Sequence, residues 1–220
     1  MGKKQKSSEK ISAESIMSAY RETVLRNGKR PATVYAFCMD QKIQERDFYE
    51  YFGSFESLEK AIWISFFEST RTAIESDADY ASLTAREKVL TFYFAFMERL
   101  KDDRSFVMQQ LDSWQKIEGI PVFIRGTLEA FESWINQVLN MGKTTREVAS
   151  RPLLEKQYAK LFQLHFLFIL HFWLHDHSAN FEKTDAAIEK SVTLAFDLVG
   201  KGVLDNALDF GKFLFQQAKA

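Results

Sequence analysis

The chain has 220 residues, of which 46% are hydrophobic, and a formal net charge of −1. This composition suffices for a sizeable core, while the near-zero charge excludes a molecule whose overall field attracts nucleic acid or membranes, so any nucleic-acid surface has to be local. A single cysteine, Cys38, excludes an intramolecular disulfide and indicates a reducing, cytoplasmic environment.

The first ten residues are basic and carry four lysines, Lys3, Lys4, Lys6 and Lys10. No apolar stretch follows them, so the pattern predicts no secretory signal. Residues 1–10 are expected to form a disordered basic arm. Such an arm either contacts phosphates or is a solvated tail, and solvated tails are the more common of the two.

Three helices are predicted over residues 11–54. The first covers about 12–27 and stops at Gly28, because Asn-Gly pairs end helices. Thr33 is placed to cap the second, and the third covers about 44–51. Three helices in so short a stretch, the last two separated by a few residues, are typical of a helix-turn-helix.

Longer helices are predicted behind this module, and each boundary between them carries Gly, Pro, Asn or Asp, which interrupt helices. The expected helices cover 55–76, 84–101, 103–117, 120–140, 153–176, 182–200 and 203–217. No alternating strand pattern is present. The sequence therefore predicts an all-α fold, with a helix-turn-helix domain over 11–54 and a larger helical domain over 55–220.

The helices predicted over 153–176 and 182–200 are apolar on more than one face. A helix that is apolar all round must be buried all round, so we expect a homodimer formed through residues 153–200. A fully internal helical hairpin is the alternative. The most apolar run, Leu161–Leu174, is shorter than the ~20 residues of a membrane span, so no span is expected.

The most specific signal in the chain runs from Thr33 to Leu58. Thr33-Val34 opens it, Phe37-Cys38 follows, and its most distinctive part is Phe48-Tyr49-Glu50-Tyr51-Phe52-Gly53-Ser54-Phe55-Glu56-Ser57-Leu58. This stretch resembles the N-terminal module of the tetracycline-repressor-like (TetR) family of transcriptional regulators. The resemblance implies a homodimer whose third helices enter the major groove about one DNA turn, ~34–36 Å, apart. It also implies that residues 55–220 bind a ligand and dimerise.

Several DNA-facing positions depart from the family's pattern. Gln41-Lys42 stands where the family has Ala-Gly, while Asp47 and Phe55 replace two residues that commonly meet phosphate. Asp47 is expected to repel phosphate. Residues 1–60 hold eleven Lys/Arg against nine Asp/Glu, a weak positive balance for a DNA-binding domain. The residues still suited to contact DNA are Thr33, Lys42, Gln44, Glu45, Arg46, Tyr49 and Tyr51.

The middle of the chain is rich in aromatic residues, which would suit a cavity for a small apolar or lipid-like ligand. The residues expected to line it are Phe92, Phe96, Trp114, Trp134, His165 and Phe168. No cofactor is expected. The leading functional hypothesis is a ligand-responsive DNA-binding regulator, a repressor in the simplest form. The alternative is a protein of the same fold that has lost DNA binding and binds a lipid or isoprenoid as an accessory protein.

A short histidine cluster lies near the end of the helix predicted over 153–176. His171 and His175 are four residues apart, a spacing that suits two ligands of a transition metal, and His177 follows. Histidines at a helix C-terminus also interact with its last carbonyls, and this second interpretation is preferred, with no metal. No arrangement of nucleophile, base and acid is visible, so an enzyme is not expected.

Overall fold

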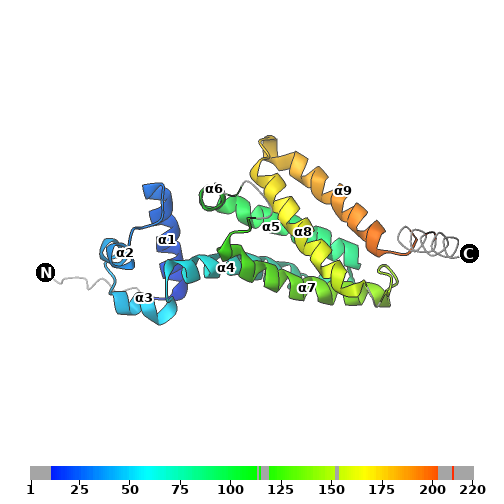
Figure 1. The fold of residues 1–220 in the computed structure, drawn as a ribbon, viewed down its shortest axis with the longest axis horizontal. Coiled ribbons are helices and arrows are strands. Elements are labelled where there is room, and N and C mark those ends of the chain that lie inside the picture. Colours follow the sequence, from blue (N-terminus) through cyan, green and yellow to red (C-terminus); the bar gives the residue numbers. More distant parts are fainter. Residues whose placement is uncertain (1–10, 113, 115–118, 152–153, 203–209, 211–220) are drawn as a thin grey trace, which may run out of the picture.

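The computed structural model of the chain describes residues 11–112, 114, 119–151, 154–202 and 210, and all regular structure in them is helical (Figure 1). This confirms the all-α fold. The α-helices are α1 (Ala13–Asn27), α2 (Val34–Gln41), α3 (Glu45–Tyr51), α4 (Phe55–Glu75), α5 (Ala85–Asp102), α6 (Arg104–Leu111), α7 (Arg125–Thr144), α8 (Glu155–Leu174) and α9 (Glu182–Val199). Three 3₁₀ turns are η1 (Tyr80–Ser82), η2 (Val122–Ile124) and η3 (Ala179–Phe181).

Most helix boundaries lie within two residues of the predicted ones, and the exceptions have local causes. The helix expected over 120–140 begins only at Arg125, after Pro121 and the turn η2. Gly142, expected to stop that helix, lies inside it. A Cβ at Gly142 would lie 2.8 Å from Val148 Cγ2 and 2.9 Å from Ala85 Cβ, so the glycine is required by packing. The helix expected over 103–117 is helical to Leu111, and the one expected over 203–217 lies outside the described residues.

Helices α1, α2 and α3 form a small N-terminal unit, here called the head, at one end of the molecule (Figure 1). Its interior is aromatic. Phe37 and Phe48 are fully buried, and their rings meet edge to face with centroids 6.1 Å apart. The ring of Tyr20 from α1 packs on Phe37, 6.0 Å away. These contacts hold the three short helices together.

Helix α4 joins the head to the larger domain. Its first turns pack on the head through Phe55, whose ring contacts those of Tyr20 and Phe37. Phe66 and Phe67 further along are buried, and the Phe67 ring packs on Phe92 of α5. In that domain α4 packs against α5, α7 and η2, and α5 packs against α9. None of the described helices combines the length and the apolar character that crossing a membrane requires.

Candidate nucleic-acid interface

The turn between α2 and α3 has the geometry of a helix-turn-helix. Thr33 Oγ1 accepts the Ala36 N–H at 3.1 Å and caps the start of α2. Lys42 ends α2 in the left-handed region with φ of 58°, and its N–H donates to the carbonyls of Cys38 and Met39. Gln41 Nε2 donates to Thr23 Oγ1 at 3.0 Å, which ties the turn to α1. The departure from Ala-Gly at this turn therefore leaves the fold of the turn intact.

Helix α3 turns one face inward and one face outward. Phe48 is fully buried in the head, while Gln44, Glu45 and Tyr49 are exposed. Arg46 is the cation of this helix, and 76% of its side chain is exposed. The outward side of α3 and its N-cap therefore presents amide, guanidinium, carboxylate and phenol groups, which are the groups that contact base edges and phosphates.

Asp47 has a structural role that the sequence analysis missed. Its carboxylate accepts the Gln44 N–H at 3.3 Å, which caps α3, and lies 3.4 Å from Arg46 Nε. Serines do the same at the matching positions of α1 and α4, where Ser15 and Ser57 accept the N–H groups of Ser12 and Ser54. A negative charge is therefore not needed for this cap, and the carboxylate also neutralises part of the Arg46 charge.

Tyr51 and Tyr49 are in different situations. Tyr51, the last residue of α3, donates its hydroxyl to the Ile11 carbonyl at 3.0 Å. Tyr49 has no such partner among the described residues, and its ring meets Phe48 edge to face. Of the two tyrosines expected to contact DNA, only Tyr49 presents an uncommitted hydroxyl.

Phe55 belongs to the core, although the sequence comparison treated it as a DNA-facing position. Its side chain is only 4% exposed, and its ring packs on Tyr20 and Phe48 with centroids 5.3 and 5.7 Å away. The Arg30 guanidinium covers the ring at 5.3 Å. A lysine here would place a charge in this aromatic cluster, so Phe55→Lys would destabilise the head and could not test phosphate contact.

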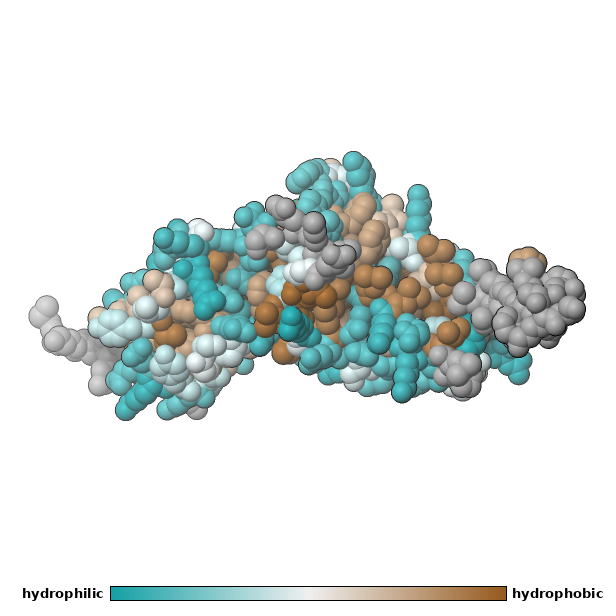
Figure 2. All heavy atoms as spheres, viewed as in Figure 1, coloured by the Kyte–Doolittle hydropathy of each residue, from teal (hydrophilic) through white to brown (hydrophobic). Residues whose placement is uncertain are grey.

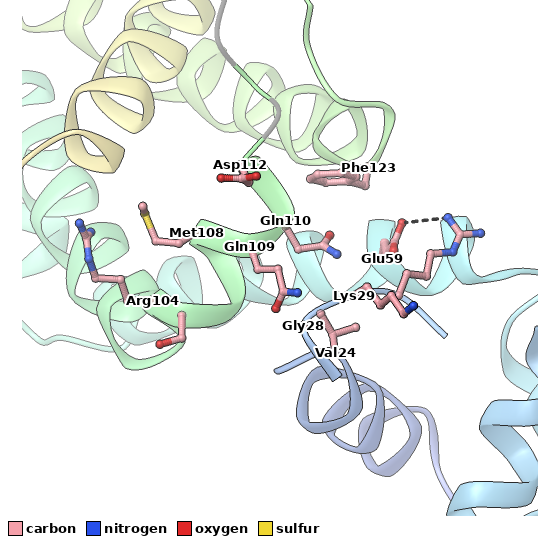
Figure 3. Close-up of a pocket in the computed structure, with 12 residues that line it drawn as sticks. Val24, Gly28, Lys29, Glu59, Arg104, Met108, Gln109, Gln110, Asp112 and Phe123 are labelled. Carbon is pink, nitrogen blue, oxygen red and sulfur yellow. Dashed lines mark ion pairs between the residues drawn. The ribbon is translucent and has the colours of Figure 1, made fainter. Parts of the chain in front are cut away.

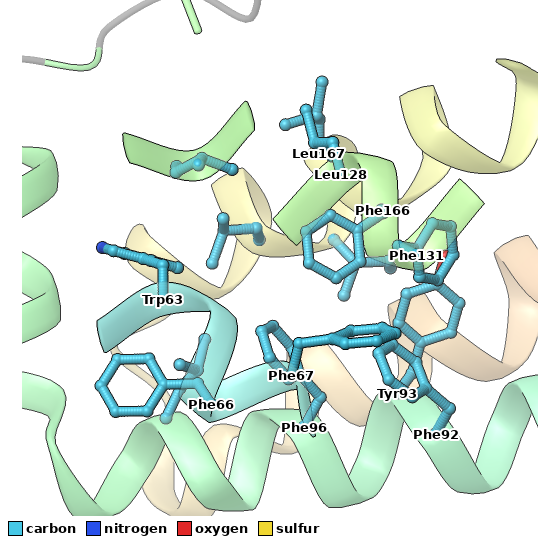
Figure 4. Close-up of a cluster of buried hydrophobic side chains, with 14 of the residues drawn as sticks. Trp63, Phe66, Phe67, Phe92, Tyr93, Phe96, Leu128, Phe131, Phe166 and Leu167 are labelled. Carbon is cyan, nitrogen blue, oxygen red and sulfur yellow. The ribbon is translucent and has the colours of Figure 1, made fainter. Parts of the chain in front are cut away.

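Phe92, Phe96 and Trp134, three of the residues expected to line a ligand cavity, are instead packed together, and Figure 4 shows Phe92 and Phe96 in the aromatic cluster. The Phe92 ring stacks on Phe96 at 5.5 Å and lies 4.6 Å from Trp134. Phe131 and Phe166 close the cluster. Trp134 also borders a small hollow of about 160 Å³ beside Lys88. The close packing leaves the expectation of a cavity at Phe92 and Phe96 without support.

The other three expected ligand residues also have protein neighbours. The two ring nitrogens of His165 lie 2.8 Å from the Tyr93 hydroxyl and 2.7 Å from Ser191 Oγ, so both have partners within the chain. Trp114 is buried, its indole N–H has no partner within the described part of the chain, and its ring meets His171 edge to face. The Phe168 ring contacts those of His165 and Phe172, with centroids 6.3 and 6.1 Å away, and its outer side is exposed.

A groove of about 920 Å³ lies at the joint between the head and the larger domain (Figure 3). One wall is the end of α1 with Val24 and Lys29, and the other is α6 with Met108, Gln110 and Asp112. Gln110 Oε1 is buried and has no hydrogen-bond partner among the described residues. The sequence analysis did not identify this groove, because it is formed by segments far apart in the chain.

The joint itself is held by charges. Asp103, between α5 and α6, accepts Arg21 Nη1 from α1 and Arg99 Nη1 from α5, both at 2.8 Å. These three side chains are partly buried. The head is therefore tied to the larger domain by an ion-pair network beside the groove.

The histidine cluster does not bring together a set of metal ligands in the described part of the chain. The rings of His171 and His175 lie 4.4 Å apart, and His175 Nδ1 lies 2.8 Å from the His171 carbonyl. All three histidines, His171, His175 and His177, border one surface hollow of about 270 Å³. This geometry matches the interpretation of histidines at a helix C-terminus.

An apolar stripe is exposed on α8 and α9. Leu164 and Phe168 on α8 are 53% and 40% exposed, and Leu194 on α9 is 59% exposed. In Figure 2 hydrophobic residues gather where α8 lies in Figure 1. The alternative of a fully internal hairpin therefore does not hold, because these large side chains face outward in the single chain.

Comparison with known proteins places these features in a family. A family model described as the tetracycline repressor-like C-terminal domain matches residues 88–214. The chain is similar to a TetR transcriptional regulator from Nitrosomonas europaea, with 17% identity, 83% of this chain and 96% of that one covered, and a TM-score of 0.60. No curated protein matches.

Two further solved structures are similar in fold. A tetR-family regulatory protein from Rhodococcus has 19% identity and a TM-score of 0.51, covering 87% of this chain and 98% of its own. BioQ from Mycobacterium smegmatis has 12% identity and a TM-score of 0.54, covering 86% and 98%. At these identities the structural likeness concerns the fold, whereas the family model covers more than half of the chain.

Proposed function

Because this chain belongs to the tetracycline-repressor-like family, we propose that it is a ligand-responsive transcriptional regulator that binds DNA as a homodimer, in the simplest case as a repressor. Its third helix, α3, enters the major groove. Gln44 and Arg46 read base edges there, and Glu45 is placed to accept from cytosine. Thr33, Lys42 and Tyr49 hold phosphates.

The observation that carries this proposal is the exposed polar face of α3 on a firmly packed head. Phe48 anchors the helix from inside and Asp47 caps its start, while Arg46 stays 76% exposed. A base-reading helix needs this combination, since its side chains must project from a backbone that does not move.

The dimer is proposed to form through α8 and α9. The exposed stripe of Leu164, Phe168 and Leu194 is the kind of surface that a second copy covers. Obligate interfaces bury ~2,000 Å² or more and resemble a core cut in half. Two copies joined this way have a two-fold axis, which matches the symmetry of paired DNA half-sites.

The ligand is proposed to act at the groove between α1 and α6. A molecule there contacts the head through Lys29 and the larger domain through Asp112 and Gln110. Its binding therefore favours one orientation of the head relative to the larger domain. The lining combines these polar groups with Met108 and Phe123. An amphipathic small molecule with a hydrogen-bond donor for Gln110 Oε1 fits this lining better than a purely apolar lipid.

Binding to DNA fragments across a salt series tests the proposal. The fragments include the region upstream of the chain's own gene and an unrelated duplex of equal length. Arg46→Ala should weaken the free energy of binding by ~1–3 kcal/mol for the preferred sequence and leave binding to the unrelated duplex unchanged. Asp47→Ser should keep the α3 cap, as serine does in α1 and α4. It should tighten binding to every duplex at low salt, because a carboxylate no longer faces phosphate.

The second candidate function is a protein of this fold that has lost DNA binding and serves as a lipid-binding accessory protein. The acids on α3, Glu45, Asp47 and Glu50, favour it. It becomes the better explanation if the wild type shows no sequence preference at low salt and Asp47→Ser merely adds non-specific binding. Mass spectrometry of the purified protein for a retained lipid would then be the next measurement.

A further inference from the structure

We propose that the groove between α1 and α6 binds an organic cation with an aromatic body, and that Glu59 is the residue that anchors its positive charge. Binding at Glu59 then acts on α3 through Tyr20. This inference rests on the proposed ligand-responsive function, and it names the class of ligand and the residues that transmit its binding.

The size and the apolar walls of the groove suit a small aromatic molecule. Its volume of about 920 Å³ lies within the ~300–1,000 Å³ that is usual for small-molecule sites. Val24, Met108 and Phe123 give it apolar surface. The Phe123 ring is stacked on Trp63, with centroids 5.8 Å apart, so it is held in place as a flat wall. An aromatic ligand packs well against such a ring.

Two buried polar groups of the groove are hydrogen-bond acceptors. Glu59 on α4 has only 8% of its side chain exposed, and Figure 3 shows its carboxylate among the lining residues. Gln110 Oε1 on α6 is buried and lacks a hydrogen-bond partner in the part of the chain that the structure describes. Buried acceptors need donors, so a ligand that fits carries N–H groups.

The carboxylate of Glu59 has a loosely held positive neighbour. Its Oε1 accepts the Tyr20 hydroxyl. Arg30 Nη1 lies 3.9 Å from Oε2, which is beyond hydrogen-bond distance, and the Arg30 guanidinium lies over the Phe55 ring. A buried carboxylate gains from a closer, hydrogen-bonded cation. The group that completes this pair is therefore positively charged.

The other cations of the groove do not make it a site for anions. The Arg104 guanidinium lies 4.3 Å from the ring centroids of both Trp173 and Phe181, and Figure 3 shows Arg104 on the far side of the groove from Glu59. Lys29 is exposed at the rim. An anion in the groove would lie near the buried Glu59 carboxylate, which would repel it.

Tyr20 connects Glu59 to the proposed recognition helix. Its fully buried ring packs on Phe37 and Phe55, with centroids 6.0 and 5.3 Å away. Both of those rings contact Phe48, which holds α3 in the head, at 6.1 and 5.7 Å. A cation on Glu59 competes with the Tyr20 hydroxyl for the carboxylate. Its binding therefore weakens the restraint on Tyr20 and, through these rings, on α3.

Three probes with one ring system and different charges test the site: naphthylethylamine as the cation, naphthylethanol as the neutral molecule and naphthylacetate as the anion. Their binding to the full-length protein is measured by calorimetry at neutral pH without DNA. We expect the amine to bind ~10-fold more tightly than the alcohol, because its hydrogen bond to Glu59 is charge-assisted, and the acetate to bind most weakly. Equal affinities, tighter binding of the acetate, or no binding of any probe at millimolar concentration would overturn the site.

Glu59→Gln removes the charge of the anchor but keeps an acceptor for Tyr20. It should bring the affinities for the amine and the alcohol to within ~2-fold of each other. The matched control is Glu56→Gln on the same helix, which changes an exposed residue outside the groove and should keep the wild-type preference. An unchanged preference in Glu59→Gln, or an equal loss in both variants, would overturn the anchoring role of Glu59.

Arg30→Gln tests the same anchor without changing a buried residue, so it also applies if Glu59→Gln fails to fold. It removes the positive charge that competes with the ligand for Glu59. The amine should therefore bind more tightly than to the wild type. Weaker binding of the amine would contradict the proposed pairing.

Binding to the preferred duplex with and without saturating naphthylethylamine tests the transmission. We expect the amine to weaken DNA binding by the wild type ~5-fold or more. Tyr20→Phe lacks the competing hydroxyl, so it should still bind the amine while its DNA affinity shifts less than ~2-fold. Equal shifts in both proteins would overturn the role of Tyr20. A wild type that prefers the amine but binds no duplex would leave the site standing and overturn the proposed function. Sequence-specific DNA binding without any preference among the probes would overturn this inference alone.

Discussion

At the scale of single residues, Lys42 carries backbone strain at the turn of the helix-turn-helix. Its φ of 58° and ψ of 37° lie in the left-handed region, which costs a residue with a side chain about 1 kcal/mol or more. We expect Lys42→Gly to raise the free energy of unfolding by about 1 kcal/mol while weakening DNA binding through the lost charge.

Lys42→Ala separates these two effects. It removes the same charge but keeps a Cβ, so its DNA binding should match that of Lys42→Gly without the gain in stability. Denaturant titrations and salt-dependent binding measure the two quantities. Equal stability of the glycine and alanine variants would show that the turn is not strained.

His165 is the other residue with a strong local constraint. Tyr93 and Ser191 occupy its two ring nitrogens, and Ser191 Oγ in turn donates to the Ala187 carbonyl. Burial lowers the pKa of the His165 imidazole to about 4, so the ring is neutral at neutral pH. This hydrogen-bonded chain makes His165 part of the core.

The depressed pKa of His165 predicts a loss of stability in acid. Between the ordinary pKa of about 6.5 and about 4, the unfolded chain binds a proton that the folded chain does not. The free energy of unfolding should therefore fall as the pH falls through this window, by at most ~1.4 kcal/mol per pH unit from this group. His165→Gln should give a flatter profile between pH 6.5 and 4 than the wild type, whereas the exposed control His175→Gln should keep the wild-type slope.

At the scale of elements, the joint between the head and the larger domain depends on Asp103. Arg21 Nη1 and Arg99 Nη1 each lie 2.8 Å from Asp103 Oδ2. We expect Asp103→Asn to lower the free energy of unfolding by about 1 kcal/mol and to speed hydrogen exchange in α1, because both charge-assisted bonds are weakened. The difference should shrink at high salt.

The neighbouring Asp102 provides the control for this prediction. It is 79% exposed and lies 4.0 Å from Arg99, so Asp102→Asn should stay within about 0.5 kcal/mol of the wild type. Similar effects of the two substitutions would mean that Asp103 does not tie the elements together.

The sequence predicted elements whose signals are local. Thr33 caps α2 and Gly28, in the left-handed region, ends α1, both as expected; Ser12 and Ser54 likewise cap α1 and α4. The position of Gly142 inside α7 was not predictable, because two residues outside the helix, Val148 and the distant Ala85, pack against it. Helix caps depend on residues that are neighbours in the sequence, whereas close packing between helices depends on residues that are distant in it.

The same distinction applies to the candidate site. The resemblance predicted that Gln44 and Arg46 face DNA, and both are exposed. The burial of Phe55 was not predicted, because a position that commonly meets phosphate in the family is filled here by an aromatic ring that the Arg30 guanidinium covers. The bond from Tyr51 to Ile11 joins residues 40 apart and also leaves no local signal.

At the scale of the whole molecule, the head and the exposed stripe lie on different parts of one chain that α4 connects (Figure 1). Any change in how α1 sits on α6 alters the position of α3 relative to α8 and α9. If α8 and α9 pair with a second copy, that change alters the distance between the two α3 helices. This distance has to match the spacing of the two DNA half-sites.

The dimer is therefore the assumption on which regulation depends, and Phe168→Asp and Leu194→Asp test it. Each places a carboxylate in a surface that we propose to be covered by apolar contacts, so each should give monomer or aggregate in sedimentation or light scattering at micromolar concentration. Leu25→Asp makes the same chemical change at a 45% exposed leucine of α1 and should leave the dimer intact. Since single exposed apolar residues are common on monomers, the control shows whether the loss of the dimer is specific to the stripe on α8 and α9. A monodisperse, well-folded monomer of the unmutated protein under these conditions would contradict the dimer, and with it the mechanism by which a ligand changes the spacing of the two α3 helices.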